Sequence, residues 1–213
     1  MRKFNVGLAL LVVAVFALVS FSPLSAYADT VSMTFLSPGG QSSGNDYVYP
    51  YNFSINGELT SLMCLSFNLE IQQNESWKAT ITQVQGNTQY EKAAYLFSLA
   101  SASGASQTTI ADAQWANWEL FDPGASSSLA NGVSQTDVTT LLNNAASYVA
   151  ANPNSSLYSK YVIYLPVAGS QPAGDGLPQD MIGKEVAPEP SSLLLLGTGL
   201  IGLAGGLRRK FAR

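Results

Sequence analysis

Three observations predict an α+β fold, an antiparallel sheet with about three helices inserted before its last strand. Residues 30–84 alternate between apolar and polar side chains with the period of two that is typical of strands. Residues 88–152 change to helical periodicity in three successive stretches, and a compact apolar run of strand length follows at 161–167. Runs of strands followed by runs of helices indicate an α+β fold.

The first 28 residues have the order of a secretory signal peptide with an apolar signal helix. Basic residues, an apolar run and a small-residue cleavage site follow one another: Arg2 and Lys3, then 6–19, then Ala26 and Ala28. A membrane anchor is the alternative, but the apolar run is shorter than the ~20 residues that a spanning helix needs. We therefore expect signal peptidase to cleave after Ala28, which makes Asp29 the mature N-terminus.

A β-hairpin is predicted in the first part of the middle domain. Asn56-Gly57 is the strongest two-residue hairpin turn, and residues 59–69 form the predicted returning strand. The alternate residues before the turn are Tyr47, Tyr49, Tyr51, Phe53 and Ile55. A further strand has Trp77, Ala79 and Ile81 on its buried face. We expect at least three strands before Gly86.

Start and stop motifs predict the bounds of the three helices. The first has a capping box from Thr88 to Glu91 and runs to Ala100; the second runs from Thr109 to Phe121; the third runs from a capping box at Ser134 to Asn152. Residues 168–187 are rich in Gly, Pro and Asp and are predicted to be a linker. The resulting organisation is a signal peptide at 1–28, a secreted domain at 29–167, the linker, and a tail at 188–213.

The tail has three parts in a fixed order. They are the residues Pro188, Glu189 and Pro190, an apolar stretch at 193–207, and the basic cluster Arg208, Arg209 and Lys210. This array resembles the PEP-CTERM sorting signal. The resemblance implies a short C-terminal transmembrane helix, which anchors the chain in the membrane before cleavage. Basic residues stay on the cytoplasmic side and stop transfer, which leaves Glu189 at the outer face.

The same resemblance implies a route and partners for the protein. An integral-membrane exosortase cleaves near the motif and passes an inner-membrane intermediate to the cell surface or exopolysaccharide matrix of a Gram-negative-type bacterium. Glu189 serves recognition rather than catalysis in this interpretation, and a plain C-terminal anchor is the alternative. Such tails are also labelled as ice-binding protein C-terminal domains, but the middle of this chain lacks regular Thr-rich repeats.

Composition excludes several classes of function. The net charge is −4 with no basic cluster outside the termini, which argues against nucleic-acid binding. The chain contains no histidine, which removes the commonest general base and the commonest transition-metal ligand. We expect no catalytic residues, no metal and no cofactor, so the protein is not predicted to be an enzyme.

One cysteine and one glutamine form the candidate site. Cys64 lies on a predicted strand, and Gln114 opens a Gln-x-Ala-x-Trp segment on the second predicted helix. These two segments resemble the halves of the thioester domain of bacterial surface adhesins over roughly residues 63–121. The resemblance implies that the Cys64 thiolate attacks the Gln114 carboxamide, that ammonia leaves, and that a surface amine later opens the thioester. Trp115 and Trp118 would shield the bond from water.

Two other interpretations of these residues stay open. A lone cysteine is often a small buried core residue, and Trp115 and Trp118 recur at helical spacing as in a packed helix. The alternate tyrosines Tyr47, Tyr49 and Tyr51 are typical of a sheet core but also offer aromatic faces on which sugars stack. The function is therefore either a reactive adhesin or a passive carbohydrate- or matrix-binding module.

Overall fold

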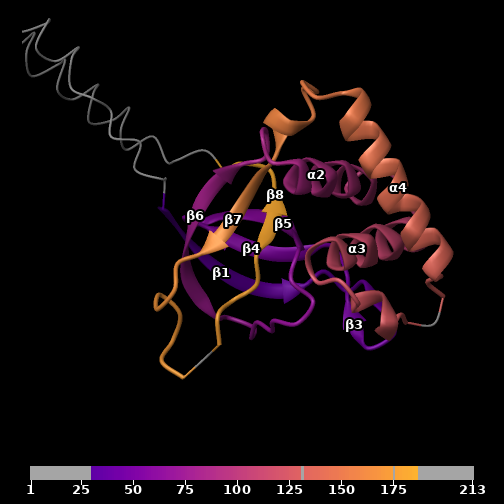
Figure 1. Ribbon diagram of the computed structural model, residues 1–213. Helices are drawn as coiled ribbons and strands as arrows, with labels where there is room; N and C mark the ends of the chain where they lie inside the picture. The colour runs from indigo at the N-terminus through magenta and orange to yellow at the C-terminus, as the bar shows by residue number, and fades with distance from the viewer. Residues whose placement is uncertain (1–29, 131, 175, 187–213) are drawn as a thin grey trace, which may run out of the picture.

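The computed structural model describes residues 30–130, 132–174 and 176–186, and shows a closed β-barrel with helices on one side (Figure 1). Every strand pair of the barrel is antiparallel. In spatial order the six strands are β1 (Thr30–Pro38), β4 (Tyr51–Ile55), β5 (Glu58–Cys64), β8 (Met181–Gly183), β7 (Val162–Pro166) and β6 (Ser76–Gln83), which pairs back to β1. The predicted antiparallel sheet with inserted helices is confirmed, and its closure into a barrel is new.

The predicted hairpin is formed by β4 and β5. Asn56 and Gly57 have φ values of 51° and 92°, the two positive values that a type I′ turn requires. The returning strand ends at Cys64 rather than at residue 69. Beyond Cys64 the chain leaves the strand ladder, and Phe67 packs against two tryptophans of a helix.

The predicted row of alternate tyrosines is divided between two elements. Tyr47 belongs to a separate two-stranded hairpin, β2 (Ser42–Ser43) and β3 (Asp46–Tyr47). Tyr51 is the first residue of β4, and Pro50 stands between them. Because proline has no N–H to donate, it breaks a continuous strand at this point.

Alternate residues of the six strands point into the barrel and form one buried apolar cluster. Its strand members are Val31, Met33, Phe35, Tyr51, Phe53, Ile55, Leu62, Cys64, Trp77, Ala79, Val162, Tyr164 and Met181. Residues of the opposite face, including Met63 and Ile182, pack in a second cluster with the first helix. The barrel therefore has a filled interior, and one of its outer faces is covered by helices.

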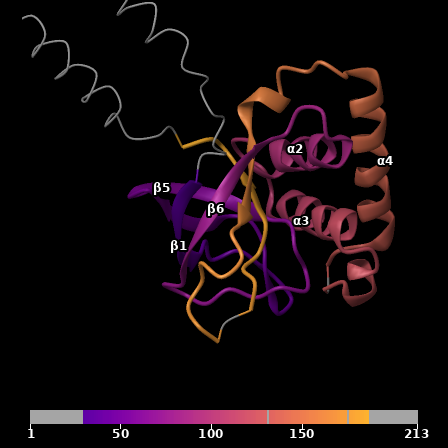
Figure 2. The same cartoon turned by 60° about the vertical axis from the view of Figure 1, so that its left-hand side comes forward.

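Three helices lie between β6 and β7 in the chain: α2 (Thr88–Ala100), α3 (Gln107–Phe121) and α4 (Gln135–Ala151). Two short 3-10 turns, η1 (Ala125–Ser128) and η2 (Tyr158–Lys160), follow α3 and α4. Helices α2 and α3 lie against the barrel, and α4 packs across them on the side away from it (Figure 2). This arrangement places α3 directly over the end of β5.

The helix starts test the predicted capping boxes. For α4 the box is confirmed, because the Ser134 hydroxyl accepts a hydrogen bond from the Asp137 N–H at 3.0 Å. Helix α2 is capped one residue earlier than predicted, by Asn87, whose side chain accepts from two backbone N–H groups. Helix α3 is capped by Ser106 and begins at Gln107, before the predicted Thr109. Asparagine and serine are the stronger caps, so they set the starts.

The predicted linker at 168–187 is wrong in one respect. Residues 181–183 form β8, which pairs with β5 on one side and β7 on the other and closes the barrel. Gly183 fits there because an added Cβ would lie 2.2 Å from the Leu62 Cδ2 atom. The secreted domain therefore extends to the end of the described residues.

The predicted signal helix and the predicted C-terminal transmembrane helix lie outside the described residues. Within 30–130, 132–174 and 176–186, none of the helices combines the length and apolar character that crossing a membrane demands.

Candidate functional site

The fold brings Cys64 and Gln114 into contact, although they are 50 positions apart in the chain. Cys64 is the last residue of β5, and Gln114 lies in the middle of α3. The side-chain Nε2 of Gln114 donates a hydrogen bond of 2.6 Å to the backbone carbonyl of Cys64. Both residues have no exposed surface. The two residues singled out by the sequence pattern therefore meet inside the domain.

The other end of the Gln114 amide is also held. Its Oε1 accepts a hydrogen bond of 3.2 Å from the backbone N–H of Tyr49, in the segment that leads into β4. An N–H that points at a carbonyl oxygen stabilises negative charge that develops there during acyl transfer. Gln114 thus connects α3 to two parts of the barrel wall, with its carbonyl group oriented by a backbone donor.

The Cys64 thiol is buried and protonated at neutral pH. It donates to the backbone carbonyl of Ser66 at 3.1 Å. Burial raises the pKa of Cys64 to about 12, while Trp118 and the hydrogen bond to the Ser66 backbone lower it in part, and Asp180 and Asp122 raise it further. Such a thiol is poorly reactive toward external reagents, because the thiolate is the nucleophile.

An aromatic cluster surrounds the sulfur. The buried indole Nε1 of Trp118 has no hydrogen-bond partner among the described residues, and Trp118 lowers the pKa of the Cys64 thiol. Phe67 packs on both Trp115 and Trp118, with ring centroids 5.4 and 5.3 Å apart. The carboxylate of Asp122 accepts from the Phe67 N–H and fixes that loop. Trp115 and Trp118 meet edge to face at 5.0 Å and share the buried cluster with Cys64.

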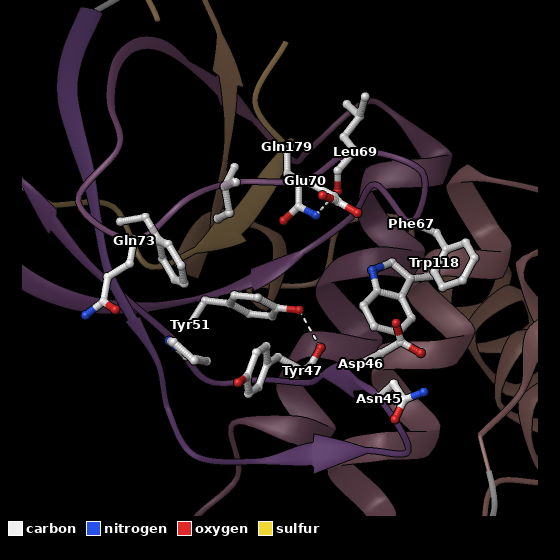
Figure 3. A pocket seen from close by; sticks show the side chains of 13 residues that line it. Asn45, Asp46, Tyr47, Tyr51, Phe67, Leu69, Glu70, Gln73, Trp118 and Gln179 are labelled. Carbon is white, nitrogen blue, oxygen red and sulfur yellow. Dashed lines mark hydrogen bonds between the residues drawn. The ribbon is translucent and has the colours of Figure 1, made fainter. Parts of the chain in front are cut away.

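A pocket of about 480 Å³ opens beside this cluster (Figure 3). Trp118 and Tyr51 form part of its wall, and each is also a neighbour of Cys64. Tyr51 pairs with Leu62 across β4 and β5, so it lies diagonally from Cys64 on the same inner face. Cys64 itself does not line the pocket. Tyr51 and Trp118 therefore belong both to the pocket wall and to the buried cluster that contains Cys64.

The three tyrosines of the sequence pattern have different surroundings. Tyr47 is 52% exposed at the pocket, and its backbone carbonyl accepts from the hydroxyl of the buried Tyr51 (Figure 3). Tyr49 turns toward the helices and meets Phe97 edge to face at 5.4 Å. The three rings therefore do not form one sugar-binding face, because the break at Pro50 turns Tyr49 away.

Sequence reasoning missed three contributors to this region. The Tyr49 N–H is a backbone group, which no side-chain pattern identifies. Phe67 was placed on a strand, and Gln179 was placed in the linker, although both line the pocket. Within the described part of the chain, no group of three or more His, Cys, Asp or Glu side chains could hold a metal ion.

The C-terminal end of the described chain is attached to the barrel. The Tyr164 hydroxyl donates to the Lys184 carbonyl at 2.7 Å and accepts from the Val186 N–H at 3.2 Å.

Residues 186–210 match the PEP-CTERM protein-sorting motif. The motif indicates a protein that is exported and sorted by exosortase to the cell surface. The comparisons with curated proteins and with solved structures gave no match.

The matched segment contains the predicted motif residues and the predicted basic cluster. These are Pro188, Glu189, Pro190, Arg208, Arg209 and Lys210, and all of them lie outside the described residues, as do the predicted cleavage residues Ala26 and Ala28. The match covers residues 186–210 and does not extend over the strands and helices of the barrel domain.

Proposed function

We propose that the exported domain is an adhesin that attaches covalently through an internal thioester between Cys64 and Gln114. The observation that supports this most directly is the buried contact of the two residues, with the Gln114 amide held between the Cys64 carbonyl and the Tyr49 N–H. A buried glutamine makes such contacts as a structural link as well, so the proposal rests on the chemistry that follows and on its test.

Formation of the bond needs one cysteine and one carboxamide, because the thiol proton leaves with the amide nitrogen as ammonia. The Cys64 sulfur attacks the Gln114 side-chain carbon, a C–S bond forms, the C–N bond breaks, and ammonia leaves with the thiol proton. In the structure the thiol donates to Ser66, so attack requires rotation of the Cys64 side chain toward the amide. The Tyr49 N–H stabilises the oxyanion that forms on Oε1.

The bond would store an acyl group behind Trp118 and Tyr51. A primary amine that reaches the Gln114 carbonyl carbon replaces the sulfur, so that an amide forms with the Gln114 side chain and Cys64 becomes a thiol again. Each molecule reacts once, and the protein is therefore an attachment device rather than a turnover enzyme. Burial among aromatic rings protects the bond from hydrolysis by excluding water.

The proposed export route adds processing steps at both ends of the chain to the sorting that the motif indicates. Signal peptidase removes residues 1–28, the tail holds an inner-membrane intermediate through its apolar segment, and exosortase releases the domain to the surface or exopolysaccharide matrix of a Gram-negative-type bacterium. Glu189→Ala tests the tail: the variant should stay membrane-bound with an epitope at its C-terminus intact, whereas Glu185→Ala should be processed normally. Equal processing of both variants would contradict a role for the motif.

Mass spectrometry of the full-length chain in detergent tests the thioester. We expect the wild-type protein to be one ammonia lighter than its sequence and unreactive toward thiol reagents after denaturation at low pH. Gln114→Ala should have its full mass and one labelled thiol on denaturation, and Cys64→Ala should have its full mass and none. Wild-type protein of full mass with a labelled thiol would exclude the bond and leave Gln114 a structural link.

A further inference from the structure

We infer that the pocket beside Cys64 binds a sugar residue that carries a primary amine, as in a glucosamine polymer. The inference rests on the proposed function where it names the amine that opens the thioester. The binding step itself does not need Cys64 and is tested without it. Three features of the pocket support this ligand class: an unpaired buried amide oxygen, aromatic faces, and carboxylates without a basic neighbour.

The unpaired oxygen belongs to Gln179. This side chain is 9% exposed and lines the pocket. Its Nε2 donates to the Leu69 carbonyl, which fixes the orientation of the amide, while Oε1 has no hydrogen-bond partner among the described residues (Figure 3). A buried acceptor without a partner costs free energy, and a ligand that donates a hydrogen bond to it recovers that cost. Sugar hydroxyl and amine groups are such donors.

Aromatic side chains provide most of the apolar wall. They are Phe35, Tyr47, Tyr51, Phe67 and Trp118. Tyr47 is the most accessible of them, and its ring stands at the pocket without a hydroxyl contact to the rest of the wall (Figure 3). Pockets that combine apolar walls with a few convergent polar groups are typical of small-ligand sites. The flat C–H face of a pyranose ring matches a tyrosine ring that is held at the edge of such a wall.

The charges of the pocket select a cation. Asp46 and Glu70 line it, and none of the described residues that line it is a lysine or arginine. Residues 29–187 contain four lysines and thirteen acidic residues, a net charge of −9, so the whole domain attracts polycations. A protonated amine makes charge-assisted hydrogen bonds with carboxylates. A neutral or N-acetylated sugar lacks this interaction, and we therefore assign the free amine.

The position of the pocket connects binding to the proposed reaction. Tyr51 and Trp118 line the pocket and share a buried cluster with Cys64, and Tyr51 lies diagonally from Cys64 on the inner face of the barrel. For capture, the amine must pass the Tyr51 and Trp118 side chains to reach the bond between Cys64 and Gln114. Recognition of a sugar amine would thus precede its covalent capture, and matrix polysaccharide rather than a second protein would be the partner.

Titration calorimetry with the Cys64→Ala full-length chain in detergent tests the binding step. The probes are oligomers of equal length made of glucosamine, of N-acetylglucosamine and of lysine. We expect the glucosamine oligomer to bind best and the N-acetylated oligomer about tenfold or more weaker, since it cannot pair with Asp46 or Glu70 as a cation. Lysine oligomer should also bind about tenfold or more weaker, because it has no ring to stack on Tyr47.

Variants of the same chain locate the site. Glu70→Gln and Tyr47→Ala should each weaken binding of the glucosamine oligomer about tenfold. The second change removes only the ring and keeps the backbone carbonyl that Tyr51 uses. Glu58→Gln makes the same change of charge at the β4–β5 turn, away from the pocket, and should leave the affinity unchanged. Tryptophan emission of each variant confirms that the barrel is folded.

Each outcome either supports or overturns the assignment of an amine-bearing sugar to the pocket. Equal binding of lysine and glucosamine oligomers, equal losses for Glu70→Gln and Glu58→Gln, or absence of binding would overturn the inference. Preference for the N-acetylated oligomer would also overturn it, in favour of a neutral-sugar module. Failure of the thioester is measured separately, by the mass of the wild-type chain. Reversible binding of the glucosamine oligomer together with a wild-type chain of full mass would keep the pocket and exclude the bond.

Discussion

Gln114 links α3 to the barrel through two buried hydrogen bonds, and removing it has a calculable cost. In Gln114→Ala, the carbonyl of residue 64 and the N–H of Tyr49 both lose their partner. A buried donor or acceptor left unpaired costs about 1–3 kcal/mol, so the free energy of unfolding should fall by about 2–6 kcal/mol. The comparison is made in a Cys64→Ala background. A thioester across 50 positions would itself add about 4 kcal/mol by restricting the unfolded chain, as a disulfide does.

Gln114→Glu in the same background separates the two hydrogen bonds by pH. A neutral carboxyl still accepts from Tyr49 and donates to the carbonyl of residue 64, whereas a carboxylate cannot donate. The folded-state pKa of this group is therefore raised above its unfolded value of about 4.3. Stability should match the glutamine parent at lower pH and fall as pH rises above about 4.3, by up to about 1.4 kcal/mol per unit, until the folded pKa is passed.

Urea unfolding followed by tryptophan emission measures both variants. Trp77, Trp115 and Trp118 are all buried, so the emission reports loss of the barrel and of α3 together. The control is Thr108→Ala, on the exposed first turn of α3, where we expect a change within about 0.5 kcal/mol. A loss below about 1 kcal/mol for Gln114→Ala, or a pH-independent Gln114→Glu, would refute the claim that this amide holds the helix on the barrel.

Two further predictions concern the barrel interior. Gly183→Ala places a Cβ 2.2 Å from the Leu62 Cδ2 atom and should cost about 1–3 kcal/mol in urea unfolding. Leu62→Ala combined with it should cost less than the two single changes added, and strict additivity would contradict the close contact. Burial raises the pKa of the Cys64 thiol from the ordinary 9.0 to about 12 in the structure, and Gln114→Ala keeps this thiol free to titrate. The free energy of unfolding of Gln114→Ala should therefore fall as pH rises from 9 toward 12, and adding Cys64→Ala should reduce that alkaline slope. The slope that remains belongs to buried tyrosines such as Tyr164, whose pKa burial raises to about 12.

Local sequence features predicted the parts of the fold that short segments determine. Asn56-Gly57 and the box at Ser134 act within a few residues, and both form as predicted. Strand β8 is different, because its three residues gain strand geometry only through pairing with β5 and β7. A short segment that contains Gly183 and follows a Pro- and Gly-rich stretch has no such pattern of its own. Hydrophobic periodicity therefore could not predict that the barrel closes.

The candidate site was predictable only in part for the same reason. Cys64 and Gln114 were found because their residue types and spacing resemble a known pair. The donor from Tyr49 is a backbone group, and Gln179 reaches the pocket through a chain path that the sequence does not reveal. The break at Pro50, which sends Tyr49 to the helices and leaves Tyr47 at the pocket, also depends on tertiary packing.

The hydrogen bond between Val186 and Tyr164 places the barrel very close in sequence to the sorting motif. Val186 is held by the barrel, and Pro188 follows two residues later, at most about 7 Å along an extended chain. An enzyme that binds Pro188, Glu189 and Pro190 must therefore accommodate the folded barrel next to its binding site, because no long linker separates the motif from the domain. Freeing more chain would require peeling β8 away and exposing the edges of β5 and β7. Access to the sorting motif therefore depends on whether β8 is paired in the barrel.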